Sequence, residues 1–400
     1  MPLRIAFDLD GVLADMESEL VRQSEVLFGE PMTRRLQERA AEAGDATAAD
    51  NAKAAAAGTP EAAPDFAPSV VQLNMTSRQQ RRLWHHVESI ENFWERLDEL
   101  EPGVIQRLAS LAADRRWEII FLTKRPETAG ATAQVQSQRW LESKGFTLPS
   151  VFVVQGSRGR IAASLGLDIV VDDRPENCLD VVVDSKARAI LVFRDDASRM
   201  PAAAPTAPGT PDAAPAFAPQ VALLNMRARQ QRRLWQHVES IENFWEGLAE
   251  LEPGVIQRLA GIAIDRRWEI IFLTKRPETA GATAQVQSQR WLESKGFTLP
   301  SVFVVQGSRG RIAASLGLDI VVDDRPENCL DVVVDSKARA ILVWRADESQ
   351  LPAAAQRLGI GVVKSVAHCL EILTQVDSAT REEPGVMTRV MRLLGLKEQA

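Results

Sequence analysis

Acidic residues follow two short apolar segments of the chain in closely spaced pairs. Asp8 and Asp10 follow residues 3–7, and Asp172 and Asp173 follow residues 168–171. Two carboxylates at this spacing repel each other unless a cation lies between them. A third apolar segment, residues 117–122, is followed by Thr123. Taken alone, this threonine is as well explained by a structural role, capping a turn or a helix, as by a role in a site. If the three segments are strands of one parallel sheet, their ends converge on one pocket.

The order of the apolar segments predicts the scaffold that would bring these residues together. Segments typical of buried strands alternate along the chain with segments that have helical spacing. The strand-like segments are residues 117–122, 151–154, 168–171 and 189–193, and the helical ones are 104–113, 134–144 and 161–165. This alternation is typical of parallel βαβ units, which bind ligands at the carboxyl ends of their strands. One further amphipathic helix is expected over residues 83–97, before Pro102 and Gly103.

The chain contains a long internal repeat at an offset of 151 residues. Residues 58–200, the first repeat, return with few substitutions as residues 209–351, the second repeat, and residues 114–192 return unchanged as 265–343. Each repeat carries its own alternating helices and strands, so most of a domain is duplicated in tandem. Residues 1–57 and 352–400 occur once. The Ala/Pro-rich residues 40–68 and 201–219 have the composition of linkers.

Three motifs give the sequence a family resemblance. Residues 7–15 (FDLDGVLAD), 121–126 (FLTKRP) and 170–177 (VVDDRPEN) resemble the first, second and fourth motifs of the haloacid dehalogenase-like hydrolases. Within that family the chain is most similar to the phosphatase branch near the 5′(3′)-deoxyribonucleotidases, because it has a second aspartate in the first motif. The resemblance implies a Rossmann-like parallel sheet with helices on both faces and a helical cap at about residues 16–113.

The resemblance also implies roles for individual residues. Asp8 would be the nucleophile that takes the phosphoryl group, and Asp10 would protonate the leaving oxygen and then activate water. Mg²⁺ would be held by Asp8, the backbone carbonyl of Asp10 and Asp172, with Asp173 in support. Thr123 would donate a hydrogen bond to a phosphate oxygen.

The basic residue of the family's third motif has no perfect match in this chain. Arg158 and Arg160 begin a predicted helix, whose N-terminus also favours an anion. Lys144 is the competing choice, but it precedes Gly145, where a lysine is expected simply to complement a helix dipole. We prefer Arg158, although the planar guanidinium would clamp a phosphate differently from a lysine.

The second repeat reproduces only part of this site. Its counterparts are Thr274, Arg309, Asp323 and Asp324, and no segment ahead of them carries an Asp-x-Asp pair. A sheet without this central strand has unpaired backbone groups on both sides of the gap. We therefore expect one complete site, built from the first repeat, which is synthesised together with the N-terminal strand before the second repeat exists. The second-repeat residues are expected to be inactive.

These features predict a domain layout. Residues 1–200 would form the hydrolase domain, with a core strand at 1–10, cap and linker at about 16–113, and the rest of the core at 114–194. Residues 201–219 would be a linker, 220–376 the second copy without the nucleophile strand, and 377–400 a C-terminal tail. The unique C-terminal part is expected to supply a last strand at 359–363 and a helix at 366–373.

The composition of the chain argues against several classes of binding partner. The 400 residues are 45% hydrophobic and 25% charged, which is typical of globular domains, and the net charge of −7 provides no basic face for a nucleic-acid polymer or a membrane. The three cysteines are too few and too scattered for a disulfide framework or a zinc site. No segment is apolar enough to span a bilayer, so we expect a cytoplasmic protein.

The sequence therefore predicts an Mg²⁺-dependent phosphomonoester hydrolase with a small phosphorylated substrate, a nucleoside monophosphate being one candidate. The alternative is a phospho-ligand binding or interaction protein whose catalysis the duplication has disabled. The aromatic residues Trp84, Phe93 and Trp94 could stack on a nucleobase, but their helical spacing favours core packing.

Overall fold

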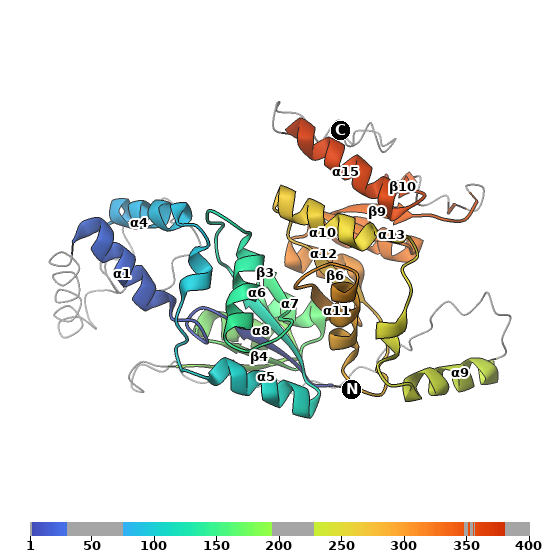
Figure 1. The fold of residues 1–400 in the computed structure, drawn as a ribbon, viewed down its shortest axis with the longest axis horizontal. Coiled ribbons are helices and arrows are strands. Elements are labelled where there is room, and N and C mark those ends of the chain that lie inside the picture. The colour runs from blue at the N-terminus through green and yellow to red at the C-terminus, as the bar shows by residue number, and fades with distance from the viewer. Residues whose placement is uncertain are drawn as a thin grey trace.

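The fold was analysed in a computed structural model, which describes residues 2–29, 75–193, 228–347, 351–352, 355 and 357–380. The two repeats form two α/β bodies that lie side by side, with the N-terminal strand inside the first of them (Figure 1). The predicted linkers, all of residues 30–74 and the predicted tail beyond residue 380 lie outside the described residues. The α/β class and the parallel sheet predicted from the sequence are confirmed.

The first repeat and the N-terminal segment together build one parallel sheet of five strands in the order β3-β2-β1-β4-β5. Its strands are β1 (Arg4–Asp8), β2 (Glu118–Thr123), β3 (Val151–Val153), β4 (Ile169–Asp172) and β5 (Arg188–Leu191). β1 is central: Phe7 lies opposite Phe121 of β2 and Val171 of β4. The strand that carries Asp8 is therefore held between the two strands that end at Thr123 and Asp172.

Helices cover both faces of this sheet because alternate residues of its strands point to opposite faces. Ile119 and Phe121 of β2 pack with α5 (Val104–Arg115) and α6 (Ala133–Ser143) in one buried cluster. Ile120 and Leu122 pack with α7 (Arg158–Leu165) and α8 (Pro175–Asp184) in another. Every residue of β2 is buried, so its position and register are strongly fixed.

The single long helix expected over residues 83–97 is wrong. Helix α4 (Ser77–Ser89) starts at a capping box formed by Thr76 and Gln79 and ends before Ile90. Asn92 then adopts a left-handed conformation (φ 52°), and a separate 3-10 helix, η2 (Phe93–Arg96), follows. The apolar spacing continues across this break because α4 and η2 bury their side chains in the same cluster.

The segment expected to form the cap is divided between two places. α4 packs against α1 (Met16–Phe28) at one end of the molecule, away from the second repeat (Figure 1). η2 and α5 instead belong to the main core, where Phe93, Trp94 and Ile105 have no exposed surface. The described residues that could act as a cap are therefore α1 and α4.

The second repeat forms two separate sheets in place of one. β6 (Ile271–Thr274) pairs with β7 (Ser301–Val304), and β8 (Ile320–Asp323) pairs with β9 (Arg339–Val343), which pairs in turn with β10 (Gly361–Val363). Within the described residues no strand joins β6 to β8, the position that β1 fills in the first repeat. The helices are α9 (Ala228–Ser240), η5 (Phe244–Gly247), α10 (Val255–Arg266), α11 (Ala284–Ser294), α12 (Arg309–Leu316) and α13 (Pro326–Asp335).

The unique C-terminal segment completes the outer edge of the second repeat. β10 pairs with β9, and α15 (Val366–Thr380) packs against α10 and β9. Cys369 and Ile372 of α15 are buried beside Ile341 and Val343. The strand and helix expected near residues 359–373 are confirmed, with a later strand start and a longer helix.

The two repeats contact each other through equivalent surfaces. Gln138 donates to the carbonyl of Leu299 (2.6 Å), and its counterpart Gln289 donates to the carbonyl of Leu148 (2.6 Å). Reciprocal contacts of this kind are those of a two-fold symmetric dimer interface, here within one chain. Ser164 and Ser315, which are counterparts, contact each other directly (2.6 Å).

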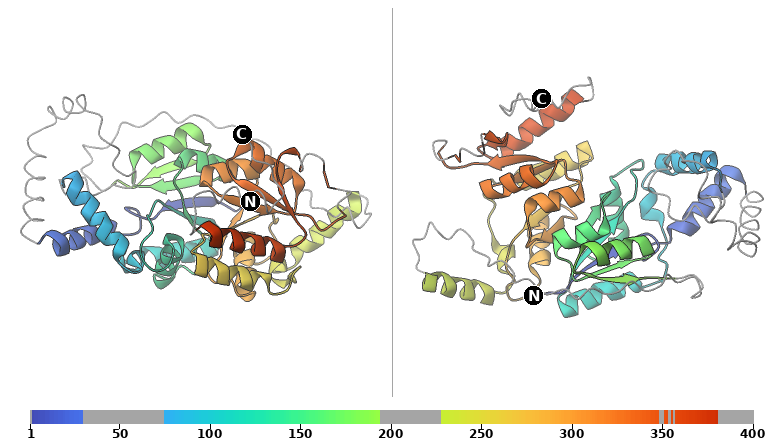
Figure 2. Two further views of the ribbon diagram at one scale, coloured as in Figure 1. Left: turned by 90° about the horizontal axis from the view of Figure 1, so that it is seen from above. Right: turned by 180° about the vertical axis from the view of Figure 1, so that it is seen from behind.

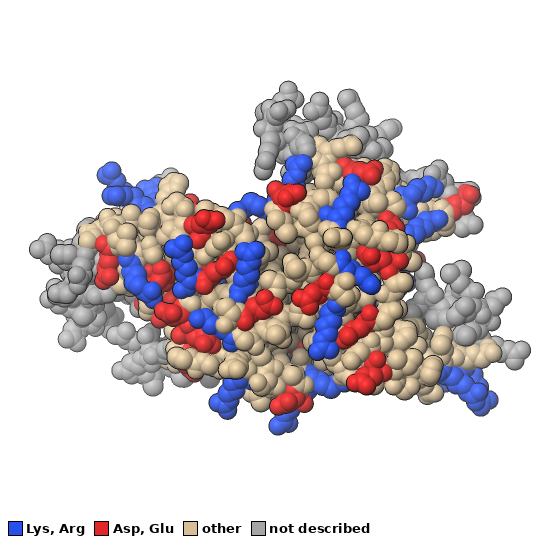
Figure 3. All heavy atoms as spheres, viewed as in Figure 1, with Lys and Arg blue, Asp and Glu red and all other residues tan. Residues whose placement is uncertain are grey.

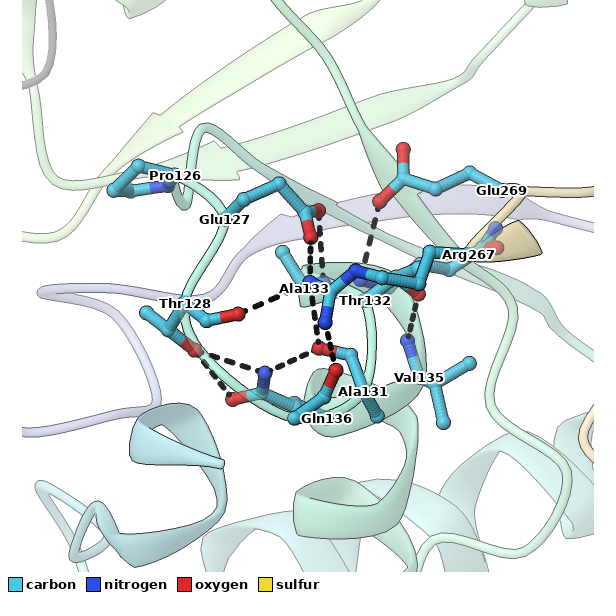
Figure 4. A network of polar contacts seen from close by, with 12 residues as sticks. Pro126, Glu127, Thr128, Ala131, Thr132, Ala133, Val135, Gln136, Arg267 and Glu269 are labelled. Carbon is cyan, nitrogen blue, oxygen red and sulfur yellow. Dashed lines mark hydrogen bonds and ion pairs between the residues drawn. The ribbon is translucent and has the colours of Figure 1, made fainter. Parts of the chain in front are cut away.

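Further reciprocal contacts surround this interface. Arg116 pairs with Glu278 (2.9 Å), and its counterpart Arg267 pairs with Glu127 and donates to the carbonyl of Thr128 (3.0 Å) (Figure 4). The rings of Phe152 and Phe303 meet edge to face within a cluster that both repeats share. The two repeats also lie side by side in the views from above and from behind (Figure 2).

The face of the molecule drawn in Figure 3 carries charges of both signs. Lys and Arg side chains are interspersed with Asp and Glu over the face drawn in Figure 3, so that neither sign dominates it. No helix among the described residues is both long and apolar enough to cross a bilayer.

Candidate active site

The predicted site residues of the first repeat meet at the carboxyl edge of the five-stranded sheet. Asp8, Thr123 and Asp172 are the last residues of three adjacent strands, β1, β2 and β4. Arg158 is the first residue of α7, which follows β3. Asp10 lies two residues beyond β1. Parallel strands thus bring together side chains that are up to 164 residues apart in the sequence.

Arg158 lies between the carboxylates of two strands. Its guanidinium forms an ion pair with Asp8 and, through Nε, lies 3.4 Å from Oδ2 of Asp172. Arg158 is 2% exposed and Asp172 has no exposed surface. Ser157 caps the helix by accepting a hydrogen bond from the backbone N–H of Arg160, which fixes the start of α7. Arg158 therefore supplies buried positive charge directly beside Asp8.

Asp10 is held by a residue that the sequence analysis did not single out. Arg125 donates from Nη2 to Oδ1 of Asp10 (2.7 Å) and from Nε to both carboxylate oxygens (3.0 Å each). Thr123 donates from its hydroxyl to Oδ2 of Asp10 (3.2 Å). Arg125 lies in the motif FLTKRP, two residues after the end of β2. A basic residue so close to a strand end was the feature of the sequence that could have identified it as a site residue.

Arg125 is itself fixed by the core. Its guanidinium lies over the rings of Trp94 (5.0 Å) and Trp140 (5.5 Å), and Nη1 donates to the hydroxyl of Ser137 (2.9 Å). A buried guanidinium between two indole rings is stabilised by cation–π attraction and loses little further freedom when it binds a carboxylate. Trp94 and Trp140 thus position Arg125, and through it Asp10. The buried Trp94 is not free to stack on a nucleobase.

Asp172 and Asp173 complete a group of four carboxylates. Asp172 accepts hydrogen bonds from the backbone N–H of Arg174 (2.9 Å) and from the amide of Asn177 (2.9 and 3.0 Å). Asp173 lies against Gly11, where an added Cβ would be 1.9 Å from Oδ2 of Asp173. Because Gly11 also has a φ of +82°, only glycine lets the loop after β1 approach Asp173.

The crowding of these carboxylates changes their ionisation. Burial raises the pKa of Asp8 well above its ordinary value, Arg158 opposes that rise, and the charges of Asp172, Asp10 and Asp173 add to it. Burial, and then the charge of Asp172, raises the pKa of Asp173 to about 7. With all four carboxylates ionised, the group would carry more negative charge than Arg158 and Arg125 neutralise, which is why protonation is favoured and why an added cation would restore the ionised form.

The donor chemistry of this group fits Mg²⁺, which binds carboxylate and carbonyl oxygens. The carboxylates are not arranged around a common point, however. Among the described residues no three Asp, Glu, His or Cys side chains lie close enough together to hold a metal ion. Asp8 and Asp172 both face Arg158, and Asp10 faces Arg125. Binding a metal would require Asp8 and Asp172 to turn from Arg158 toward the ion.

The competing choices for the basic phosphate-binding residue lie elsewhere. Arg160 is exposed on α7, and Lys144 is the C-terminal cap residue of α6. Arg158 pairs with Asp8 and Asp172, and among the described residues neither Arg160 nor Lys144 forms an ion pair with these aspartates or with Asp10. The geometry therefore favours Arg158 among the three residues that the sequence left open.

The second repeat assembles its counterparts without the two aspartates of β1. Asp323 keeps the hydrogen bonds from Arg325 N–H (2.9 Å) and Asn328 (3.0 Å), and Arg309 Nε lies 3.6 Å from it. Nη2 of Arg309, whose counterpart binds Asp8, instead reaches the carbonyl of Leu273 at 3.4 Å. The described part of the second repeat therefore presents the arginine and the aspartate of the arrangement without counterparts of Asp8 and Asp10.

Comparison with known protein families and with curated proteins identified no relative of this chain. No protein-family model matches the chain, and a search of the curated proteins found no match, so the site is interpreted from its own chemistry.

Proposed function

We propose that the chain is an Mg²⁺-dependent phosphomonoester hydrolase that works through an aspartyl-phosphate at Asp8, and that its sheet is a Rossmann-like core duplicated in tandem. The observation that carries this proposal is the meeting of buried Asp8 and Arg158 with half-buried Asp10 at the carboxyl edge of one sheet, a group that would combine a nucleophile, an anion clamp and a proton carrier. The resemblance of the three motifs to the haloacid dehalogenase-like hydrolases supports the same chemistry.

Asp8 is suited to the nucleophilic step by its place at the end of β1 and by its ion pair with Arg158, which opposes the rise in its pKa and so favours the carboxylate form. A carboxylate oxygen of Asp8 would attack phosphorus, the bond to the ester oxygen would break, and an acyl phosphate would form. Arg158, 2% exposed, would then contact the phosphoryl oxygens in place of the Asp8 carboxylate. A guanidinium fixed in a site of low polarity stabilises charge that develops there more strongly than one in water.

Asp10 is suited to proton transfer because it is held apart from Asp8 by its own partners. Arg125 and Thr123 fix the Asp10 carboxylate through hydrogen bonds of 2.7 to 3.2 Å. Asp10 would have to start the reaction protonated; it would give that proton to the departing ester oxygen, and the carboxylate so formed would take a proton from the water that attacks the acyl phosphate. The products are the alcohol and inorganic phosphate, and both aspartates return to their starting forms.

Mg²⁺ would be held by Asp8 and Asp172, with the carbonyl of Asp10 and with Asp173 in support, and when bound it would neutralise charge on the phosphoryl group. Asn177 and the N–H of Arg174 would keep one side of Asp172 fixed during binding. Gly11 would keep Asp173 close to β1.

The test is a panel of phosphomonoesters, including p-nitrophenyl phosphate and the nucleoside monophosphates, assayed with and without Mg²⁺ on the full chain. Asp8→Asn is nearly isosteric, so the chain should fold and turnover should fall on the order of 10³-fold or more. The thermal transition measured by circular dichroism is the control for folding. Full activity of Asp8→Asn, or the absence of Mg²⁺-dependent hydrolysis across the panel, would refute the proposal.

A further inference from the structure

The second repeat has two unpaired strand edges facing the position that β1 fills in the first repeat. β6 and β8 belong to different sheets, and no described strand pairs with either of them on that side. Val322 of β8 is 42% exposed, whereas its counterpart Val171, covered by β1, is 8% exposed. Unpaired edges with exposed apolar residues readily accept an added strand.

The edges of this open position are fixed. On one side, Ile271 and Leu273 of β6 pack against the buried cluster that includes Phe303 and residues of the first repeat. On the other side, β8 is held by β9 and α13, where Val332 has no exposed surface. An incoming strand would therefore meet two preformed edges and would lose little free energy in ordering them.

The residues that line the open position match the N-terminal strand by sequence. Residues 269–274 and 320–323 are identical to residues 118–123 and 169–172, which pair with β1. A strand with the sequence of residues 3–10 would thus meet the same side chains that it already meets in the first repeat. Its apolar residues would cover Val322 and Ile320, the latter 39% exposed.

Charge complementarity points to the same occupant. In the first repeat Arg125 binds Asp10, and Arg158 binds Asp8. Among the described residues, their counterpart Arg276 donates to the hydroxyl of Ser288 (2.9 Å) and forms no ion pair, and Arg309 lies beside Asp323 alone (3.6 Å). Burial lowers the pKa of Arg276 to about 10, as expected for a cation that lacks a counter-charge.

The opposite end of the open position shows the complementary charge. In the first repeat Glu118, 2% exposed, forms an ion pair with Arg4 at the start of β1 (2.9 Å). Its counterpart Glu269 is exposed and accepts a hydrogen bond from the backbone N–H of Gln134 (3.3 Å) (Figure 4). The open position therefore offers one carboxylate and two guanidinium groups in the order that an Arg-x-x-x-Asp-x-Asp strand requires.

We propose that the second repeat is a strand-acceptor site, and that it binds a separate extended segment with an apolar core and the pattern Arg-x-x-x-Asp-x-Asp. The segment would add as a parallel strand between β6 and β8, with backbone hydrogen bonds to both edges and its aspartates against Arg309 and Arg276. If β1 of this chain or of a second molecule filled the position, the five-stranded sheet that donates it would lose its own central strand. A separate segment fills the position without this cost. A free phosphate would satisfy the two arginines but would leave the backbone edges and Val322 uncovered.

The test uses the full chain and a fluorescent peptide of residues 1–15, with binding followed by anisotropy. We expect one peptide to bind per chain. Val322→Asp, a change at an exposed position, should weaken binding at least about tenfold without lowering the thermal transition. Glu269→Arg should weaken binding similarly, and a peptide with Arg4→Glu should recover it on that variant.

Absence of binding, or binding that neither Val322→Asp nor Glu269→Arg alters, would overturn the proposal. Competition by millimolar inorganic phosphate, with no effect of Val322→Asp, would show an anion site instead and would also overturn it. A chain that forms dimers in light scattering, and loses them with Val322→Asp, would show that a second molecule fills the position.

An activity assay extends this test, and its expected result rests on the proposed function. The peptide should give Mg²⁺-dependent hydrolysis to the Asp8→Asn chain by supplying a nucleophile to Arg309 and Asp323, whereas a peptide with Asp8→Asn should bind without doing so. Binding without recovered hydrolysis would count against the phosphatase proposal and would leave the strand-acceptor site standing. Recovered hydrolysis would support both.

Discussion

The internal repeat permits a matched test of which half holds the working site. Asp172→Asn and Asp323→Asn remove the same charge from the same local sequence. Both aspartates accept a hydrogen bond of 2.9 Å from a backbone N–H two residues later and bonds of 2.9 to 3.0 Å from an asparagine five residues later. Both also face an arginine, at 3.4 and 3.6 Å. They differ in the presence of β1 beside only one of them.

The structure gives different expectations for stability and for turnover. An amide keeps some of these hydrogen bonds but loses their charge assistance, which costs about 1–3 kcal/mol of unfolding free energy in either repeat. Turnover should diverge. Loss of one preorganised electrostatic group at a reacting centre costs about 10²–10³-fold, or ~3–4 kcal/mol. Asp172→Asn should show this loss of kcat/KM, and Asp323→Asn should retain the activity of the unmodified chain.

The assay is steady-state phosphate release by both variants, with urea unfolding measured on the same samples. Similar unfolding losses with a turnover loss confined to Asp172→Asn would show that the site is built around β1. If Asp323→Asn abolished turnover and Asp172→Asn preserved it, the assignment of the site to the first repeat would be refuted. Equal partial losses would show that β1 divides its time between the two positions.

Three further predictions concern single residues of the site. Arg158→Ala should lower kcat/KM far more than Lys144→Ala in the same assay, and the reverse order would transfer the phosphate-binding role to Lys144. Arg125→Lys keeps the charge but loses the two-pronged contact with Asp10, so kcat should fall on the order of tenfold while the chain stays folded; an unchanged kcat would contradict a positioning role. Asp173 has its pKa raised from 3.8 to about 7, so between these values the folded chain holds a proton that the unfolded chain has released. The unfolding free energy without metal should therefore fall as pH rises from about 4 to 7, and Asp173→Asn should flatten this slope in urea titrations; an unchanged slope would refute the contribution of Asp173.

Much of the fold was predictable because strands and helices of this class have distinct sequence periods. β2 and β4 are short, apolar and buried on both faces, so their positions follow from composition alone. The break between α4 and η2 was missed because apolar spacing reports which residues are buried and not whether the backbone is continuous. Asn92, which tolerates a left-handed conformation, was the local signal.

The residues of the candidate site could be predicted from the sequence, but the ion pairs that they form with one another could not. Strand ends located Asp8, Thr123 and Asp172, since adjacent parallel strands end at one edge of a sheet. The role of Arg125 was not predictable, because it depends on Trp94 and Trp140 approaching from different elements. Likewise, nothing in the local sequence shows that Arg158 lies between Asp8 and Asp172 rather than pointing to solvent.

The contact between the repeats explains how the second one can keep its shape without a central strand. Loss of β1 removes the partner that would hold β6, but β6 and β7 gain a new neighbour in the equivalent surface of the first repeat. Ser301 donates to the carbonyl of Val151 and Ser150 donates to the carbonyl of Val302, each at 2.9 Å and with both hydroxyls buried. Buried hydrogen bonds that recur in pairs fix the angle between the bodies as well as their distance. The second repeat therefore lacks a central strand among its described residues, and its strands β6 and β7 are held instead by the equivalent surface of the first repeat.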